Sequence, residues 1–280
     1  MSRVWLCFVT AVRFAVLAQL RNRLALALVV FFIPLWLSLA YTVSAKTAVP
    51  FFLRAAHRTI TVDGNILIQL TGALHSLALI IGFMMFLATS QSAEFDSRLV
   101  MAGYPRLCLV AAKYATLLLT AAPVVLYATF WVRVFWAPER LELLAAALFV
   151  GGLIYGGAGI MLAAVLRSEL AGTLLVIMVS FLDVGLQNPI ANPAADSPVI
   201  RLLPTYGAMQ SATSAARLGT LPWTYLALGL CWALGMTAIG VTTFALRNRH
   251  RSLGNSRPAI PSPRRRHDAI EPLPETERSR

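Results

Sequence analysis

The chain has 280 residues, of which 58% are hydrophobic and 13% are charged, and its mean hydropathy is +0.70. About a quarter of the residues in soluble globular domains are charged, so this composition excludes that class and indicates an integral membrane protein. The net charge of +12 does not indicate nucleic-acid binding, because many basic residues lie where they suit orientation in the membrane and contact with anionic lipid.

Residues 1–23 are apolar but are interrupted by Thr10 and Arg13. A central Arg costs about 2.5 to 3.5 kcal/mol on membrane-insertion scales, which favours a helix on the membrane surface over a spanning helix. Trp5 and Phe8 suit that interface. A cleaved signal peptide is the alternative, although no clear A-x-A site follows and Arg13 divides the apolar region.

Repeated apolar runs, each long enough to cross about 30 Å of hydrocarbon as a helix, follow this segment. Their lack of strict alternation excludes a β-barrel, so the predicted fold is an all-α bundle. We predict six spans, at residues 24–44, 66–90, 107–132, 141–166, 170–187 and 222–246. Residues 24–246 therefore form the predicted transmembrane domain.

Positive charge predicts the orientation of the bundle. An even number of spans places both termini on one side, and that side receives 17 of the 24 Lys and Arg residues. The termini are therefore predicted to be cytoplasmic. Residues 247–280 carry nine of these basic residues and many prolines, and are predicted to form a disordered cytoplasmic tail.

The stretch "SAEFDSRLVMAGYPRL", residues 92–107, lies in a predicted cytoplasmic loop. An apolar core framed by acids and arginines suits a short helix that offers a mixed face to a partner protein. A helix lying on the lipid headgroups is the alternative. The residues that carry this prediction are Glu94, Asp96, Arg98, Leu99, Gly103, Pro105 and Arg106.

The loop between the fifth and sixth spans contains five prolines, which break long helices into short pieces. Its middle part, residues 200–217, has a moderate helical pattern. We expect one or two short helices there that enter the outer face of the membrane, where protein or a cavity surrounds them.

Three polar residues, Gln69, His75 and Asp183, lie inside predicted spans. Ionisable groups at such depths are costly and usually face protein or a water-filled cavity, so these side chains are candidates to line a transport path. The structural alternatives are an Asp capped locally at a helix end and a His bonded to a backbone carbonyl. No metal site is predicted, because the three cysteines lie in apolar contexts without metal-type spacing.

The fourth predicted span contains "GGLIYGGAGIMLAA", in which Gly152 and Gly156 form a G-x-x-x-G motif. Small residues let helix backbones approach closely. We expect packing within the subunit, with dimerisation as the alternative.

The order of a surface helix, two spans, a charged cytoplasmic helix, three spans, a Pro-rich outer loop and a final span resembles the ABC-2 type permease family. The charged loop resembles the family's pattern at Glu94, Arg98, Leu99, Val100, Gly103, Pro105 and Arg106, followed by Lys113. The stretch "RLLPTYGAMQSA", residues 201–212, is similar to the family's P-x-x-Y/W outer-loop segment. The family's frequent G-T-L is absent, "DSRLVM" standing in its place, so partner specificity is not implied.

The resemblance implies a transmembrane subunit of an ATP-driven exporter, in which residues 92–106 form a coupling helix that fits a groove on a cytoplasmic ABC ATPase. It also implies a second permease subunit, identical or related. No G-x-x-x-x-G-K-[ST] occurs in the sequence, so ATP and Mg²⁺ are expected on the partner and no cofactor is expected on this chain. The expected cargo is a hydrophobic or amphiphilic compound such as a drug, a lipid or a natural product.

Two other functions remain open at this point. A membrane anchor or assembly subunit would need the same coupling helix, and a membrane-embedded enzyme would need clustered polar groups in the bundle. The preference for Arg over Lys, 22 against two, indicates a GC-rich bacterial genome and thus a bacterial cell membrane.

Overall fold

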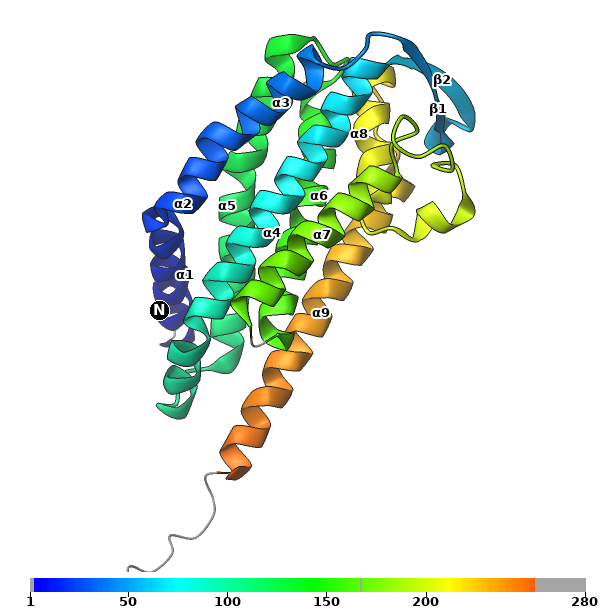
Figure 1. Ribbon diagram of the computed structural model, residues 1–280. Helices are drawn as coiled ribbons and strands as arrows, with labels where there is room; N and C mark the ends of the chain where they lie inside the picture. Colours follow the sequence, from blue (N-terminus) through cyan, green and yellow to red (C-terminus); the bar gives the residue numbers. More distant parts are fainter. Residues whose placement is uncertain (1–2, 167, 255–280) are drawn as a thin grey trace, which may run out of the picture.

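The chain is mostly helical in the computed structural model, which describes residues 3–166 and 168–254 (Figure 1). Seven helical stretches of this described part are long and apolar enough to cross a membrane: Arg3–Arg21, Arg23–Thr42, Gly64–Met101, Arg106–Phe135, Leu141–Val165, Glu169–Leu186 and Trp223–Phe244. By helix length and composition, the protein is a multi-pass membrane protein. The prediction had six such stretches, because Arg13 was taken to exclude the first one.

Helix α1 (Arg3–Arg21) is followed at Asn22 by a rod made of α2 (Arg23–Ala27), a π-helical turn η1 (Leu28–Phe32) and α3 (Ile33–Thr42). Pro34 has no N–H, so it cannot donate to the carbonyl of Val30 four residues earlier. The Tyr127 hydroxyl donates to this carbonyl instead, at 3.2 Å. A neighbouring helix thus satisfies the group that the proline leaves free.

A β-hairpin follows α3, so the all-α prediction is wrong in this segment. Strands β1 (Ala48–Leu53) and β2 (Arg58–Asp63) pair antiparallel, with a 3₁₀ turn η2 (Arg54–Ala56) between them. His57, at φ 50°, closes the turn in the left-handed region. The β-branched residues of β2 favour a strand, but the segment is too short and too polar to stand out beside the apolar runs.

The remaining helices run back and forth along one axis (Figure 1). They are α4 (Gly64–Met101), α5 (Arg106–Phe135), α6 (Leu141–Val165), α7 (Glu169–Leu186) and α9 (Trp223–Gly254), with a 3₁₀ turn η3 (Pro198–Leu202) and α8 (Tyr206–Leu218) between the last two. The start of α1, the α4–α5 turn (residues 102–105) and the last turns of α9 lie toward one end, which we call the terminal end. The hairpin and α8 lie toward the other end, which we call the hairpin end.

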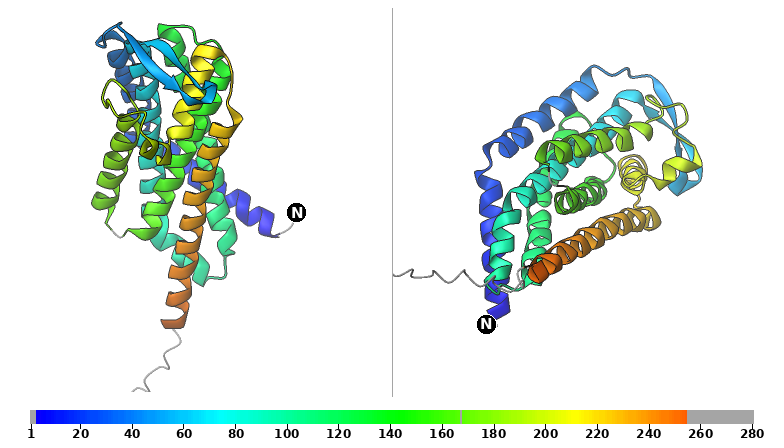
Figure 2. Two further views of the ribbon diagram at one scale, coloured as in Figure 1. Left: turned by 90° about the vertical axis from the view of Figure 1, so that its right-hand side faces the viewer. Right: turned by 60° about the horizontal axis from the view of Figure 1, so that its bottom comes forward.

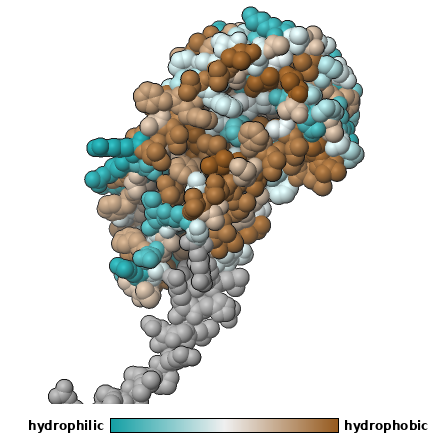
Figure 3. Space-filling model, in the orientation of Figure 1, coloured by the Kyte–Doolittle hydropathy of each residue, from teal (hydrophilic) through white to brown (hydrophobic). Residues whose placement is uncertain are grey.

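Helix α6 forms the centre of the bundle and contacts α4, α5, α7, α8 and α9. Buried side chains of α4 and α6 supply much of the core, whereas α7 and α9 carry many exposed apolar side chains. The surface is accordingly apolar over a broad area (Figure 3). An exposed apolar exterior of this extent is typical of a lipid-facing surface.

The two ends of the described chain differ from the rest of the bundle. Helix α1 runs across the bundle and not along it (Figure 2, left). Helix α9 continues to Gly254, so the predicted tail does not begin at residue 247. The rest of that tail, residues 255–280, lies outside the described residues.

Candidate functional site

The polar residues predicted inside the membrane do not form one site. Asp183, on α7, is 2% exposed, and its carboxylate accepts three hydrogen bonds. The Tyr155 hydroxyl and the Thr205 backbone N–H donate to Oδ2 at 3.0 and 3.2 Å, and the Gln187 side-chain amide donates to Oδ1 at 2.9 Å. We call these four residues the Asp183 network.

The Asp183 network connects three parts of the bundle. Tyr155 belongs to α6, Asp183 and Gln187 lie at the end of α7, and Thr205 directly precedes α8. The Gln187 amide also donates to the Thr205 hydroxyl, at 2.8 Å. Because buried polar groups must be paired, this network fixes the start of α8 against α6 and α7.

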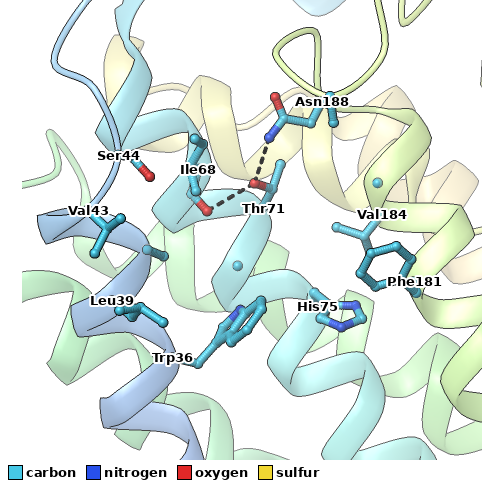
Figure 4. Close-up of a pocket in the computed structure, with 14 residues that line it drawn as sticks. Trp36, Leu39, Val43, Ser44, Ile68, Thr71, His75, Phe181, Val184 and Asn188 are labelled. Carbon is cyan, nitrogen blue, oxygen red and sulfur yellow. Dashed lines mark hydrogen bonds between the residues drawn. The ribbon is translucent and has the colours of Figure 1, made fainter.

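His75 lines a different feature, a cavity of about 260 Å³ between α3, α4 and α7 (Figure 4). Its ring lies 6.1 Å from that of Trp36 and 5.6 Å from that of Phe181, measured between centroids. At the hairpin end of this cavity, the Asn188 amide donates to the Thr71 hydroxyl at 3.2 Å. The walls are otherwise mostly apolar, so the cavity suits an aromatic or amphiphilic molecule.

Trp36, another residue of the cavity wall, carries a polar atom without a hydrogen-bond partner among the described residues. The indole Nε1 of Trp36 is buried and makes no hydrogen bond with any part of the chain that the structure describes. A buried donor without an acceptor costs about 1 to 3 kcal/mol.

Gln69 is separate from both features. It is fully buried, accepts from the Trp136 indole at 2.7 Å and donates to the Leu37 carbonyl at 3.2 Å. These bonds connect α4 to α3 and to the end of α5. Gln69 therefore joins helices and does not line the His75 cavity.

The predicted coupling segment is not a separate helix. Helix α4 continues without a break to Met101, because Glu94, Asp96 and Arg98 end the apolar run without ending the helix. Gly103, two residues after the last helical residue, stops the helix with a φ of +86°.

Backbone bonds explain this end. The N–H of Tyr104 donates to the Leu99 carbonyl at 2.9 Å, and that of Gly103 donates to the Val100 carbonyl at 3.1 Å. This is a Schellman cap, and it accounts for the "GYP" sequence. Pro105 then precedes the first residue of α5, where a missing N–H costs nothing.

The predicted coupling residues divide into two groups. Asp96 is buried and lies 2.7 Å from the Lys113 ammonium on α5, and Ser92 donates to the same carboxylate oxygen at 3.2 Å. The pair ties α4 to α5. Leu99 is partly buried.

The other predicted coupling residues are exposed and stand beside exposed apolar side chains. We call this surface the α4–α5 tip: Glu94, Phe95, Arg98, Met101, Gly103, Pro105, Arg106 and Leu107. It therefore offers both charge and apolar area to solvent or to a partner.

The glycines of α6 receive side chains from neighbouring helices. A Cβ at Gly152 would lie 2.7 Å from Ile81 Cδ1 on α4, and a Cβ at Gly156 would overlap Leu117 on α5. A Cβ at Gly159 would overlap the backbone carbonyl of Gly82 on α4. These contacts are within the subunit.

The chain matches no protein-family model and no curated protein. Among the described residues, no three His, Cys, Asp or Glu side chains are grouped as metal ligands. Sequence reasoning found Asp183 and His75 by their depth, and it missed Tyr155, Thr205 and Trp36 as their neighbours. Contact between Gln187 and Asp183 could have been predicted, since Gln187 lies one helical turn after Asp183.

Proposed function

We propose that this protein is the transmembrane subunit of an ATP-driven transporter of the ABC-2 type, in a bacterial cell membrane. In this proposal α1 lies on the cytoplasmic surface, and the other six membrane-length helices span the membrane. The terminal end then faces the cytoplasm. The steep angle between α1 and the bundle, and the outward-facing apolar side chains of α1, support this placement.

The single observation that carries the proposal is the α4–α5 tip. Phe95 is 62% exposed, Met101 71% and Leu107 77%, and they stand beside exposed Glu94 and Arg98 at the terminal end. Apolar residues rimmed by charge are typical of protein interaction sites. The Asp96–Lys113 pair behind the tip holds α4 and α5 together, so a force applied there acts on both helices.

The His75 cavity supports the cargo class of the proposal. The cavity and the tip share one helix, because His75 and Phe95 both belong to α4. A mostly apolar wall that also carries the His75, Thr71 and Asn188 side chains would hold an amphiphile with a polar group. Movement of α4 against α3 and α7 would change the shape of this cavity, as alternating access requires.

A co-purification and transport experiment tests the proposal. The protein is expressed with the ATPase encoded nearest to it and reconstituted into vesicles, and ATP-dependent movement of a fluorescent amphiphile is measured. We expect the double variant Glu94→Lys, Arg98→Glu to lose ATPase binding and transport. The control Arg58→Glu reverses an exposed charge at the hairpin end and should keep both.

Three outcomes separate the functions. Binding and transport that are lost only in the tip variant support the proposal. Binding without ATP-dependent movement of any tested amphiphile favours an anchor or assembly subunit. Equal binding by the tip variant and the wild type would exclude the tip as the coupling surface.

A further inference from the structure

A second cavity, of about 490 Å³, lies at the terminal end between α1, α4 and α5. Small side chains leave this space open: Ala15 and Ala18 on α1 and Ala88 on α4. Met85 and Leu87 give it an apolar wall. Its volume is in the range of small-molecule sites, about 300 to 1,000 Å³, and much larger than a single water needs.

The charged residues that line this cavity are basic. Lys113 and Arg21 contribute to it from α5 and α1. Lys113 makes contacts with Asp96 and with the Ser92 hydroxyl, both at 2.7 Å, which leaves the third donor of its ammonium available. Arg21 is exposed and makes no ion pair within the described residues. Since Asp96 offsets only Lys113, the cavity keeps one net positive charge.

A buried amide in the cavity wall lacks a good acceptor. Gln19 is 4% exposed, and the hydrogen bond that its Nε2 makes is to the thioether sulfur of Met85, at 3.2 Å. Thioethers are weak acceptors, so this donor is poorly satisfied. An oxygen atom in the cavity would be a stronger partner for it.

The surroundings of the cavity are those of a membrane–water boundary. Exposed leucines of α1 and α2, namely Leu17, Leu20 and Leu24, lie beside the basic residues Arg21 and Arg23. The space-filling view shows hydrophilic side chains that project at the level where α1 meets α2, next to apolar surface (Figure 3). Apolar and basic side chains so placed fit an acyl chain and a phosphate together.

We propose that this cavity binds the headgroup of an anionic phospholipid. Its phosphate lies between Arg21 and Lys113, the Gln19 amide donates to one of its oxygens, and its acyl chains extend along the exposed leucines of α1 and α2. A free phosphate shares the charged chemistry but would leave the alanine-lined space and the apolar wall unused. The bound lipid would join α1 to α4 and α5.

This inference does not depend on the transport proposal, and lipid binding by the purified protein tests it. Native mass spectrometry in detergent measures the binding of phosphatidylglycerol, of phosphatidylcholine, and of phosphatidylglycerol in the presence of excess inorganic phosphate. The variants are Arg21→Gln, which removes an exposed charge from the cavity, and Ala88→Leu, which fills it. The matched control is Arg13→Gln, because Arg13 is exposed on the same helix but does not line the cavity.

The expected result is one tightly retained phosphatidylglycerol in the wild type, with affinity about tenfold weaker in Arg21→Gln, because a hydrogen bond between charged groups is lost. Ala88→Leu should also lose the lipid, with its helical content by circular dichroism unchanged. Arg13→Gln should bind as the wild type does.

Four results would overturn the inference. Displacement by inorganic phosphate would indicate a site for free anions, and equal binding of phosphatidylcholine would remove the role of charge. Equal weakening in Arg13→Gln and Arg21→Gln would indicate general attraction to the helix surface. Wild-type affinity in Arg21→Gln, with folding intact, would exclude this cavity.

Discussion

Each end of the molecule contains a buried aspartate, and the two aspartates differ in the groups that bind them. Asp183, toward the hairpin end, accepts from a phenol, an amide and a backbone N–H, all neutral donors. Asp96, toward the terminal end, is held by one lysine and one serine. The first network joins α6, α7 and α8, whereas the second joins only α4 and α5. The hairpin end is thus held by hydrogen bonds within the protein. At the terminal end the other charged side chains, such as Glu94 and Arg98, are exposed.

The largest expected effect comes from breaking the hairpin-end network. Asp183→Ala leaves two buried donors, the Tyr155 hydroxyl and the Thr205 backbone N–H, without their acceptor, so we expect the free energy of unfolding in detergent to fall by about 2 to 4 kcal/mol. Asp196→Ala is the control, because Asp196 is an exposed acid in the loop that precedes α8. Equal stability of the two variants would contradict a fixing role for Asp183.

The next largest loss of stability is expected at the contact between α4 and α6, which lies between the two ends. Gly159→Ala places a methyl group against the Gly82 carbonyl, a backbone atom that cannot turn aside. We expect a loss of about 1 to 3 kcal/mol by thermal unfolding. Gly185→Ala is the matched helical control, since no atom lies within 4 Å of its added Cβ. A loss in Gly185→Ala as large as in Gly159→Ala would show that the cost is not one of close packing.

Breaking the terminal-end pair should cost less. Lys113→Met leaves the buried Asp96 carboxylate with Ser92 alone. The Lys113 side chain is itself 13% exposed, so we expect a loss of about 1 to 2 kcal/mol. Adding Asp96→Asn to Lys113→Met should recover part of the loss, as measured by denaturant unfolding in a double-mutant cycle. No recovery would show that Lys113 stabilises the protein through other contacts.

The smallest effect on stability is expected at the α4–α5 tip. Phe95→Ser should change the free energy of unfolding by less than about 0.5 kcal/mol, because the ring is 62% exposed. The proposed function requires binding of the ATPase to fall nevertheless, as measured by co-purification. A clear loss of stability in Phe95→Ser would place the ring in the protein's own packing.

Hydropathy was sufficient to predict most of the helices. It did not predict where a helix continues through charged residues, or where a short strand pair forms. Residues 141–166 and 170–187 were predicted as spans, and the structure has Leu141–Val165 and Glu169–Leu186. The end of α4 was misplaced because charged residues can continue a helix outside the membrane, while its real end is set by Gly103. The hairpin at residues 48–63 was missed because its pattern is short.

The site was less predictable than the fold, because its partners are distant in sequence. The depth of Asp183 predicted that it must be paired or face a cavity. Tyr155 lies 28 residues away and Thr205 22 residues away, so no local pattern links them. The alanines that open the basic cavity likewise come from two helices that are joined only by the fold.

The close contact between Gly82 of α4 and Gly159 of α6 has a mechanical consequence. Gly82 lies almost midway between Gly64 and Met101, the two ends of α4. The helix is about 57 Å long at 1.5 Å per residue, well beyond the roughly 30 Å of the hydrocarbon core. A rigid rod that pivots at its midpoint moves its two ends by equal distances in opposite directions. If α4 turned about this contact, a push of a few ångströms at Met101 would move Gly64, the residue directly after the hairpin, in the opposite direction.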